Sequence, residues 1–138
     1  MNDLSRFIKA QQRDYQQALS EIRAGRKYSH WIWYIFPQIQ GLGMSPTAQF
    51  YSINNIEEAK AFLADPYLGA NLIEISEALL ALDENDPTAV LGYPDDLKVC
   101  SSMTLFKIAG EGKYPVFQQV LDKYYGGRDD YRTIELLS

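Results

Sequence analysis

The sequence predicts an all-α protein: a compact single domain of about seven to eight short and medium helices over residues 1–138. Apolar residues recur at steps of three and four in nearly every segment, as they do on the buried face of a helix. Helix-capping residues precede these segments, often with proline next, and glycine follows several of them. The length is that of one domain, and no repeat or linker divides the chain.

Residues 4–22 carry the clearest helical pattern, with Asp3 placed to cap the start and Gly25 placed to end it. Residues 30–35 are interpreted as a short helix. A strand is the alternative, because this aromatic segment also has β-propensity. Pro37 prevents the helix from continuing, and a loop is expected over residues 38–44.

The next helices have recognisable first turns. Ser45, followed by proline, is expected to cap a helix over residues 46–51. Asn55 is expected to cap residues 56–64, with Glu58 at the capping-box position. Further helices are expected over residues 68–83, 87–91, 97–108 (opened by Pro94-Asp95-Asp96), 115–124 and 131–137, the last capped by Asp129 or Asp130.

The helix over residues 97–108 carries hydroxyl groups on its expected core side, which is unusual. Small polar residues there either bond back to carbonyls one turn earlier or line a site. The residues assigned to its inner face are Leu97, Cys100, Ser101, Thr104, Leu105 and Ile108.

Composition excludes several classes of function. The net charge is −5 and the pI is about 4.8, which argues against duplex nucleic acid as a partner. A lone cysteine, Cys100, indicates a reducing, cytoplasmic location. The start of the chain lacks a signal-peptide pattern, and no apolar run reaches membrane-spanning length, so no membrane partner is expected. With one histidine and one cysteine, no metal site and no cofactor are expected.

Residues 29–38 contain the only histidine and both tryptophans, so this segment is expected to be largely buried. Its indole N–H groups then need partners, because an unpaired buried donor costs about 1–3 kcal/mol. A nucleophilic pair of Cys100 with His30 is formally conceivable, but the helical spacing of Cys100 favours a core role.

A pocket forms if the helix over residues 97–108 packs on the aromatic segment. Aromatic walls with a few convergent polar groups are typical of small-molecule sites. Asp96 or His30 is the acid–base candidate. The loop at Gly41 and Gly43 is either a plain turn or, with Ser45, an anion cradle. The ligand-binding candidates are Trp31, Trp33, Gln38, Gly41, Gly43, Ser45, Lys98, Ser101, Ser102 and Thr104.

Motifs of one known family occur along nearly the whole chain. They are the run from His30 to Gln38, Gly41-Leu42-Gly43 with Ser45, Glu58-Ala59, Leu68-Gly69, Asp96-Leu97-Lys98, Ser101 to Phe106, and Asp130 with Thr133. In these residues the sequence closely resembles the domain of unknown function 1810 (DUF 1810) family. The resemblance implies a small, mostly helical bacterial domain with no settled activity. Some members are labelled calpastatin, but nothing in this chain supports protease inhibition.

A weaker likeness is to the NADAR, or YbiA-like, proteins, which are linked to ADP-ribose and N-glycosidic chemistry. It consists of short matches such as Ala10-Gln11.

Two functions follow as hypotheses. One is a pocket for a nucleotide-like or ADP-ribose-like molecule, acting on an N-glycosidic bond if the protein is an enzyme. The alternative is a non-catalytic adaptor or structural module that binds a protein partner. The sequence leaves the oligomeric state open.

Overall fold

The computed structural model describes residues 3–138 and confirms the all-α class. Within these residues there are nine helices, one for each helical segment expected from the sequence, and the β pairing is one isolated parallel bridge between Ile39 and Ile53. Three of the helices have only one turn or slightly more. The helices are α1 (Ser5–Arg23), α2 (Ile32–Ile35), α3 (Pro46–Phe50), α4 (Ile56–Ala64), α5 (Leu68–Ala81), α6 (Pro87–Leu91), α7 (Asp95–Ala109), α8 (Pro115–Tyr125) and α9 (Tyr131–Leu137).

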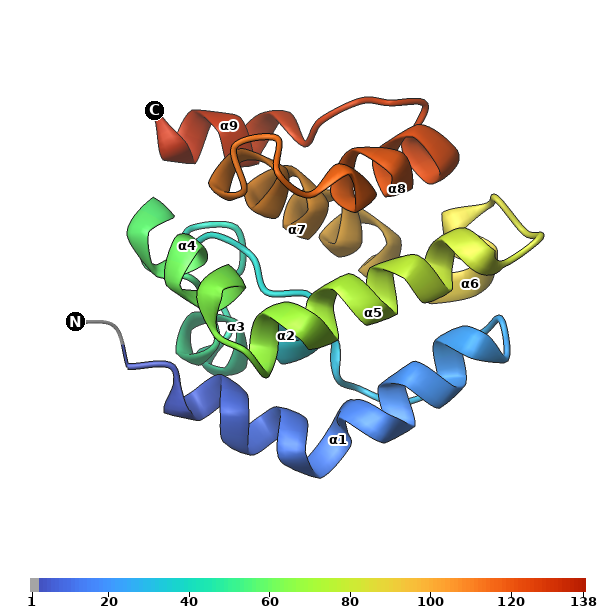
Figure 1. The fold of residues 1–138 in the computed structure, drawn as a ribbon, viewed down its shortest axis with the longest axis horizontal. Coiled ribbons are helices and arrows are strands. Elements are labelled where there is room, and N and C mark those ends of the chain that lie inside the picture. Colours follow the sequence, from blue (N-terminus) through green and yellow to red (C-terminus); the bar gives the residue numbers. More distant parts are fainter. Residues whose placement is uncertain (1–2) are drawn as a thin grey trace.

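Helix α7 lies in the middle of the molecule, and α8, α4, α6, α9 and α2 pack around it (Figure 1). Helix α5 connects α1 to the helices around α7, since it packs on α8 and α4 and also on α1. One hydrophobic core runs through this arrangement, with fully buried aromatic rings from α1, α4, α7 and α8 at its centre. These rings belong to Phe7, Phe62, Phe106 and Phe117.

Three of the four helix caps predicted from the sequence are confirmed. Ser45 Oγ accepts from Ala48 N at 3.1 Å, Asn55 Oδ1 accepts from Glu58 N at 2.9 Å, and Asp130 Oδ2 accepts from Thr133 N at 3.1 Å. Such caps satisfy backbone donors that the first helical turn leaves without partners.

Two predicted caps differ in detail. Asp3 bonds Ser5 N at 2.9 Å, but Leu4 occupies the cap position of α1. The Glu58 carboxylate accepts from Asn54 N and from the Arg6 guanidinium, which ties α4 to the start of α1.

The aromatic segment forms the short helix α2, so the helical interpretation is confirmed and the strand alternative is wrong. Trp31 is 1% exposed and its Nε1 donates to Glu21 Oε1 at 3.0 Å, which gives the buried indole its partner. His30 departs from expectation, because it is exposed on the loop before α2.

The predicted inner face of α7 is partly wrong. Leu97 is 54% exposed and Ile108 is 37% exposed, whereas Val99, Met103 and Phe106 are fully buried. A helix with neighbours on several sides has no single apolar stripe, so a rule based on one face assigns some positions incorrectly.

Candidate functional site

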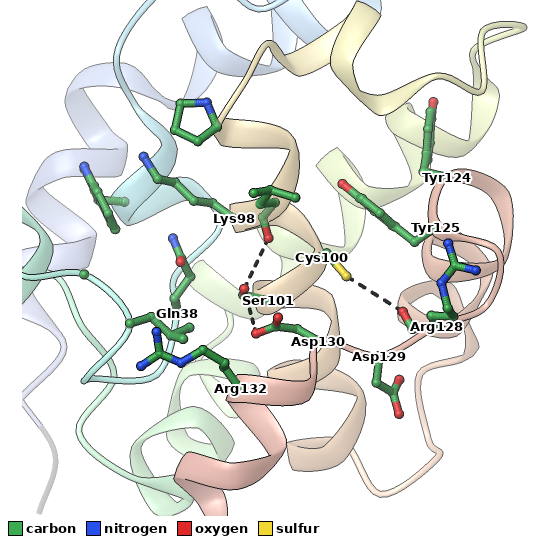
Figure 2. Close-up of a pocket in the computed structure, with 15 residues that line it drawn as sticks. Gln38, Lys98, Cys100, Ser101, Tyr124, Tyr125, Arg128, Asp129, Asp130 and Arg132 are labelled. Carbon is green, nitrogen blue, oxygen red and sulfur yellow. Dashed lines mark hydrogen bonds between the residues drawn. The ribbon is translucent and has the colours of Figure 1, made fainter.

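A groove of about 500 Å³ lies between the loop after α2, helix α7 and the segment that joins α8 to α9 (Figure 2). Trp33 and Leu42 contribute apolar surface from the loop side, and Leu97, Tyr124 and Tyr125 contribute it from the helices. Polar and charged groups lie among these side chains. The groove therefore has the mixed lining that is common in small-molecule sites.

Gln38 lies in the wall of this groove and is 6% exposed. Its side-chain nitrogen, Nε2, is buried and has no hydrogen-bond partner among the described residues. The backbone of Gln38 is fixed, because its carbonyl accepts from Ile53 N at 2.8 Å. The chain thus places a buried donor at the groove without supplying an acceptor, although most buried polar groups are satisfied.

Gly43 allows the loop to approach Trp33 closely. A Cβ atom at this position would lie 3.0 Å from Trp33 Cη2 and 2.5 Å from Ala48 Cβ. Both distances are too short for ordinary contacts, so only glycine fits without movement of its neighbours. The close contact fixes Trp33 as part of the groove wall.

Lys98 is held at the groove by its neighbours. Its Nζ lies 3.1 Å from Asp95 Oδ1 and 4.3 Å from the centre of the Trp33 ring. The other oxygen of Asp95 is bound by Lys27 Nζ at 2.7 Å, and the Lys27 side chain is only 6% exposed. One carboxylate therefore faces two ammonium groups, which leaves excess positive charge beside the groove.

Asp130 joins the end of the groove to α7. Its Oδ2 accepts hydrogen bonds from Ser101 Oγ at 3.0 Å and from the backbone N and hydroxyl of Thr133. Its backbone N donates to Thr104 Oγ1 at 2.8 Å. The hydroxyls that looked unusual on this helix thus position the start of α9.

The chemistry of Cys100 argues against a nucleophilic role. Burial, together with the negative charges of Asp130 and Asp129, raises the pKa of the Cys100 thiol to about 11. The thiol stays protonated near neutral pH and points to the carbonyl oxygen of Arg128, 3.8 Å away. The partner that a nucleophilic pair would require, His30, does not line the groove.

Five of the predicted site residues line the groove and the others do not. The five are Trp33, Gln38, Gly43, Lys98 and Ser101. Two predicted residues, Ser102 and Thr104, are fully buried in the core, and Trp31 is almost so. These three side chains are not part of the groove wall.

The predicted acid–base candidates also lie outside the groove. His30 is exposed on the loop between α1 and α2. Asp96 is buried and its carboxylate bonds Thr88 Oγ1 at 2.7 Å and Leu97 N at 2.9 Å. Gly41 and Ser45 are exposed and do not line the groove either; Gly41, with a φ of +102°, makes the turn, and the Ser45 hydroxyl caps α3.

Sequence reasoning missed the residues that come from the segment between α8 and α9. Arg128 and Asp130 line the groove from that segment, Tyr125 lines it from the end of α8, and Arg132 lines it from the first turn of α9. Neither guanidinium has a carboxylate within ion-pair distance in the described part of the chain, whereas Asp129 is paired with Lys107. The sequence signal that could have indicated these residues is the cluster of charged residues after Gly126-Gly127.

Residues 3–138 contain no group of three or more histidine, cysteine or acidic side chains placed to hold a metal ion. None of their helices is both long and apolar enough to cross a membrane.

The fold and groove define a small, all-helical protein with a mixed apolar and cationic groove beside its central helix. Its family is shown by a match over residues 1–137 to the family described as "Protein of unknown function (DUF1810)". The chain belongs to the DUF1810 family, as the sequence motifs predicted.

A solved relative has the same fold. The chain is 46% identical to the conserved hypothetical protein Rv1873 from Mycobacterium tuberculosis, whose crystal structure it matches with a TM-score of 0.93. The match covers 98% of this chain and 96% of the other. No curated protein matches the chain. The likeness to NADAR proteins finds no support in these comparisons.

Proposed function

We propose that the protein binds a nucleotide-like or ADP-ribose-like small molecule in the groove beside α7. The observation that carries the proposal is the buried, unpartnered Nε2 of Gln38 in the groove wall. An unsatisfied buried donor costs about 1–3 kcal/mol, and an acceptor on a bound ligand would remove that cost. Trp33 and the tyrosines offer surface for a planar ring, and the basic side chains favour an anion.

Cleavage of an N-glycosidic bond extends this proposal as a hypothesis. It needs an acid or base beside the ligand, and Asp130 is a groove carboxylate whose Oδ2 is occupied but whose Oδ1 accepts no hydrogen bond among the described residues. If the protein cleaves such a bond, Asp130→Asn should abolish turnover while the ligand still binds. Product analysis by chromatography with NAD and ADP-ribose as substrates checks this.

The first test is thermal unfolding of the protein with NAD, ADP-ribose, nucleotides and nucleosides. A ligand at about 100 times its dissociation constant adds roughly 2.7 kcal/mol of stability. For a domain of this size that corresponds to a shift of several degrees. A shift with one chemical class supports the proposal. Flat curves with every compound contradict it and favour the adaptor alternative.

A matched pair of variants tests the role of Gln38 itself. Gln38→Met and Ser102→Ala each remove a buried polar atom that lacks a partner. We expect both variants to be as stable as the wild type or more stable, since neither leaves an unsatisfied group. Only Gln38→Met should lose the ligand-induced shift, because Ser102 does not line the groove. An unchanged shift in Gln38→Met would contradict the proposal.

A further inference from the structure

The two ends of the groove differ in whether their polar groups already have partners. At the α8 end, Tyr125 Oη donates to the carbonyl oxygen of Asp96 at 2.6 Å, and Tyr124 Oη donates to that of Leu79 at 2.5 Å. With these hydroxyls occupied, the tyrosines present ring surface to the groove rather than hydrogen bonds. Arg128 lies at the same end, and its guanidinium has no ion-pair partner among the described residues (Figure 2).

At the end formed by the loop after α2, two donor side chains lack an acceptor and a third has to share one. Gln38 Nε2 has no acceptor, and Arg132 has no carboxylate within ion-pair distance among residues 3–138. Lys98 shares the single carboxylate of Asp95 with the buried Lys27. In the view of Figure 2, the Gln38 carboxamide lies between the Lys98 ammonium and the Arg132 guanidinium.

We infer that Gln38, Lys98 and Arg132 form a phosphate subsite, and that Tyr124, Tyr125 and Arg128 hold the ring of the same ligand. This inference rests on the proposed function and adds the orientation of the ligand to it. A phosphate group offers several acceptor oxygens, which suit an amide donor, an ammonium and a forked guanidinium together. A planar ring suits tyrosine rings and the flat face of a guanidinium.

The charges around the groove agree with an anionic ligand. The chain has a net charge of −5, yet Lys98, Arg128 and Arg132 all line the groove. Of the two acidic residues there, Asp129 is paired with Lys107. Asp130 Oδ2 is occupied by Ser101 and Thr133, which fixes its carboxylate on the α7 side.

The test compares four nucleosides (adenosine, guanosine, cytidine and uridine) with their 5′-monophosphates. Binding is measured by calorimetry at low salt and at high salt. We expect the monophosphate of at least one base to bind more tightly than its nucleoside, with an advantage that shrinks as salt screens the charges.

Two groove variants should then separate the two ends. Arg132→Gln should weaken the monophosphate about tenfold or more and leave the nucleoside unchanged, because it removes a charged contact to phosphate only. Arg128→Ala should weaken the binding of the nucleoside and of the monophosphate by the same factor, because Arg128 contacts the ring that both ligands share. Arg26→Gln is the control, since it makes the same charge change at an exposed residue outside the groove.

The outcomes distinguish failure of this inference from failure of the proposed function. If nucleosides and monophosphates bind equally, or if Arg132→Gln weakens both alike, the phosphate subsite is wrong while a ligand groove remains. If none of the eight compounds binds, both the subsite and its orientation are overturned. If NAD and ADP-ribose also fail to shift the unfolding temperature, the proposed function falls with them.

Discussion

Glu21 is a buried carboxylate at the end of α1 that organises the loop leading to α2. Its Oε1 accepts hydrogen bonds from the backbone N of Tyr28, the backbone N of Ser29 and Trp31 Nε1. Its Oε2 accepts from Gln17 Nε2 and Ser29 Oγ. One side chain at 5% exposure thus fixes the position of the aromatic segment.

These hydrogen bonds make Glu21 sensitive to pH. Burial by itself raises the pKa of the carboxyl, but the hydrogen bonds outweigh it and lower the pKa from 4.5 to about 2. A lowered folded-state pKa contributes stability above the unfolded value of 4.5. That contribution is lost progressively as the pH falls from 4.5 towards about 2.

We therefore predict that Glu21→Gln lowers the free energy of unfolding by about 1–3 kcal/mol at pH 7, because charged acceptors make the stronger bonds. The difference from the wild type should shrink as the pH falls below 4.5. Urea unfolding at several pH values measures it. Glu77→Gln, at an exposed site, is the control and should have little effect. A difference that does not change with pH would contradict the role of the Glu21 charge.

At the scale of the element, α7 determines both the core and one wall of the groove. Its buried face includes Leu105, which is 0% exposed, while Leu97 on the same helix is 54% exposed. The periodicity of the sequence assigned both leucines to the inner face. The neighbours of α7 decide between them, because α8, α4 and α6 cover some sides of the helix and leave others open.

The two leucines provide a matched comparison. Leu105→Ala should lower the free energy of unfolding by about 2–5 kcal/mol, because it leaves a cavity in a packed core. Leu97→Ala should change it by about 0.5 kcal/mol or less, as exposed substitutions usually do. Chemical denaturation of both variants gives the values. Equal losses would mean that Leu97 is buried in solution.

At the scale of the whole molecule, one hydrophobic core contains buried side chains from seven helices. These are α1, α2, α4, α5, α6, α7 and α8. Within residues 3–138 the core forms a single cluster, and α5 packs on α1 as well as on α4 and α8. Contacts of this kind favour unfolding in a single step in a chain below about 150 residues.

We predict that residues 1–138 unfold as one cooperative unit. Far-UV circular dichroism follows all helices, whereas fluorescence follows Trp31 in the core and Trp33 at the groove. The two signals should give the same midpoint in urea, as two-state unfolding requires. Separate midpoints would contradict the prediction of a single domain and would show that the groove region unfolds independently.

The predictable features were the ones that depend on neighbours in the sequence. Ser45, Asn55 and Asp130 cap their helices as expected, since each cap joins residues three positions apart. The short helix α2 was also predictable, because Pro37 disfavours a helical conformation at the residue before it and so limits the length of the helix. The family motifs identified the correct family but did not identify a functional site.

The groove could be predicted only in part. Gln38 and Lys98 were selected for their chemistry, and packing brings them to one surface. Arg128 was missed because it precedes the cap Asp130 in what looked like an ordinary polar loop, and Arg132 was missed because it lies in the first turn of a short helix with no site motif. Asp96 was selected for its charge, yet the fold uses it to bond Thr88.

The order of residues along the chain was sufficient for the helices, their caps and the all-α class, because these depend on local geometry and on hydrophobic periodicity. Only the tertiary structure decided that Trp33 and Gln38 would meet Arg132, about a hundred residues later in the chain. Contacts between distant segments follow from how all the helices pack together, and no short stretch of sequence contains that information.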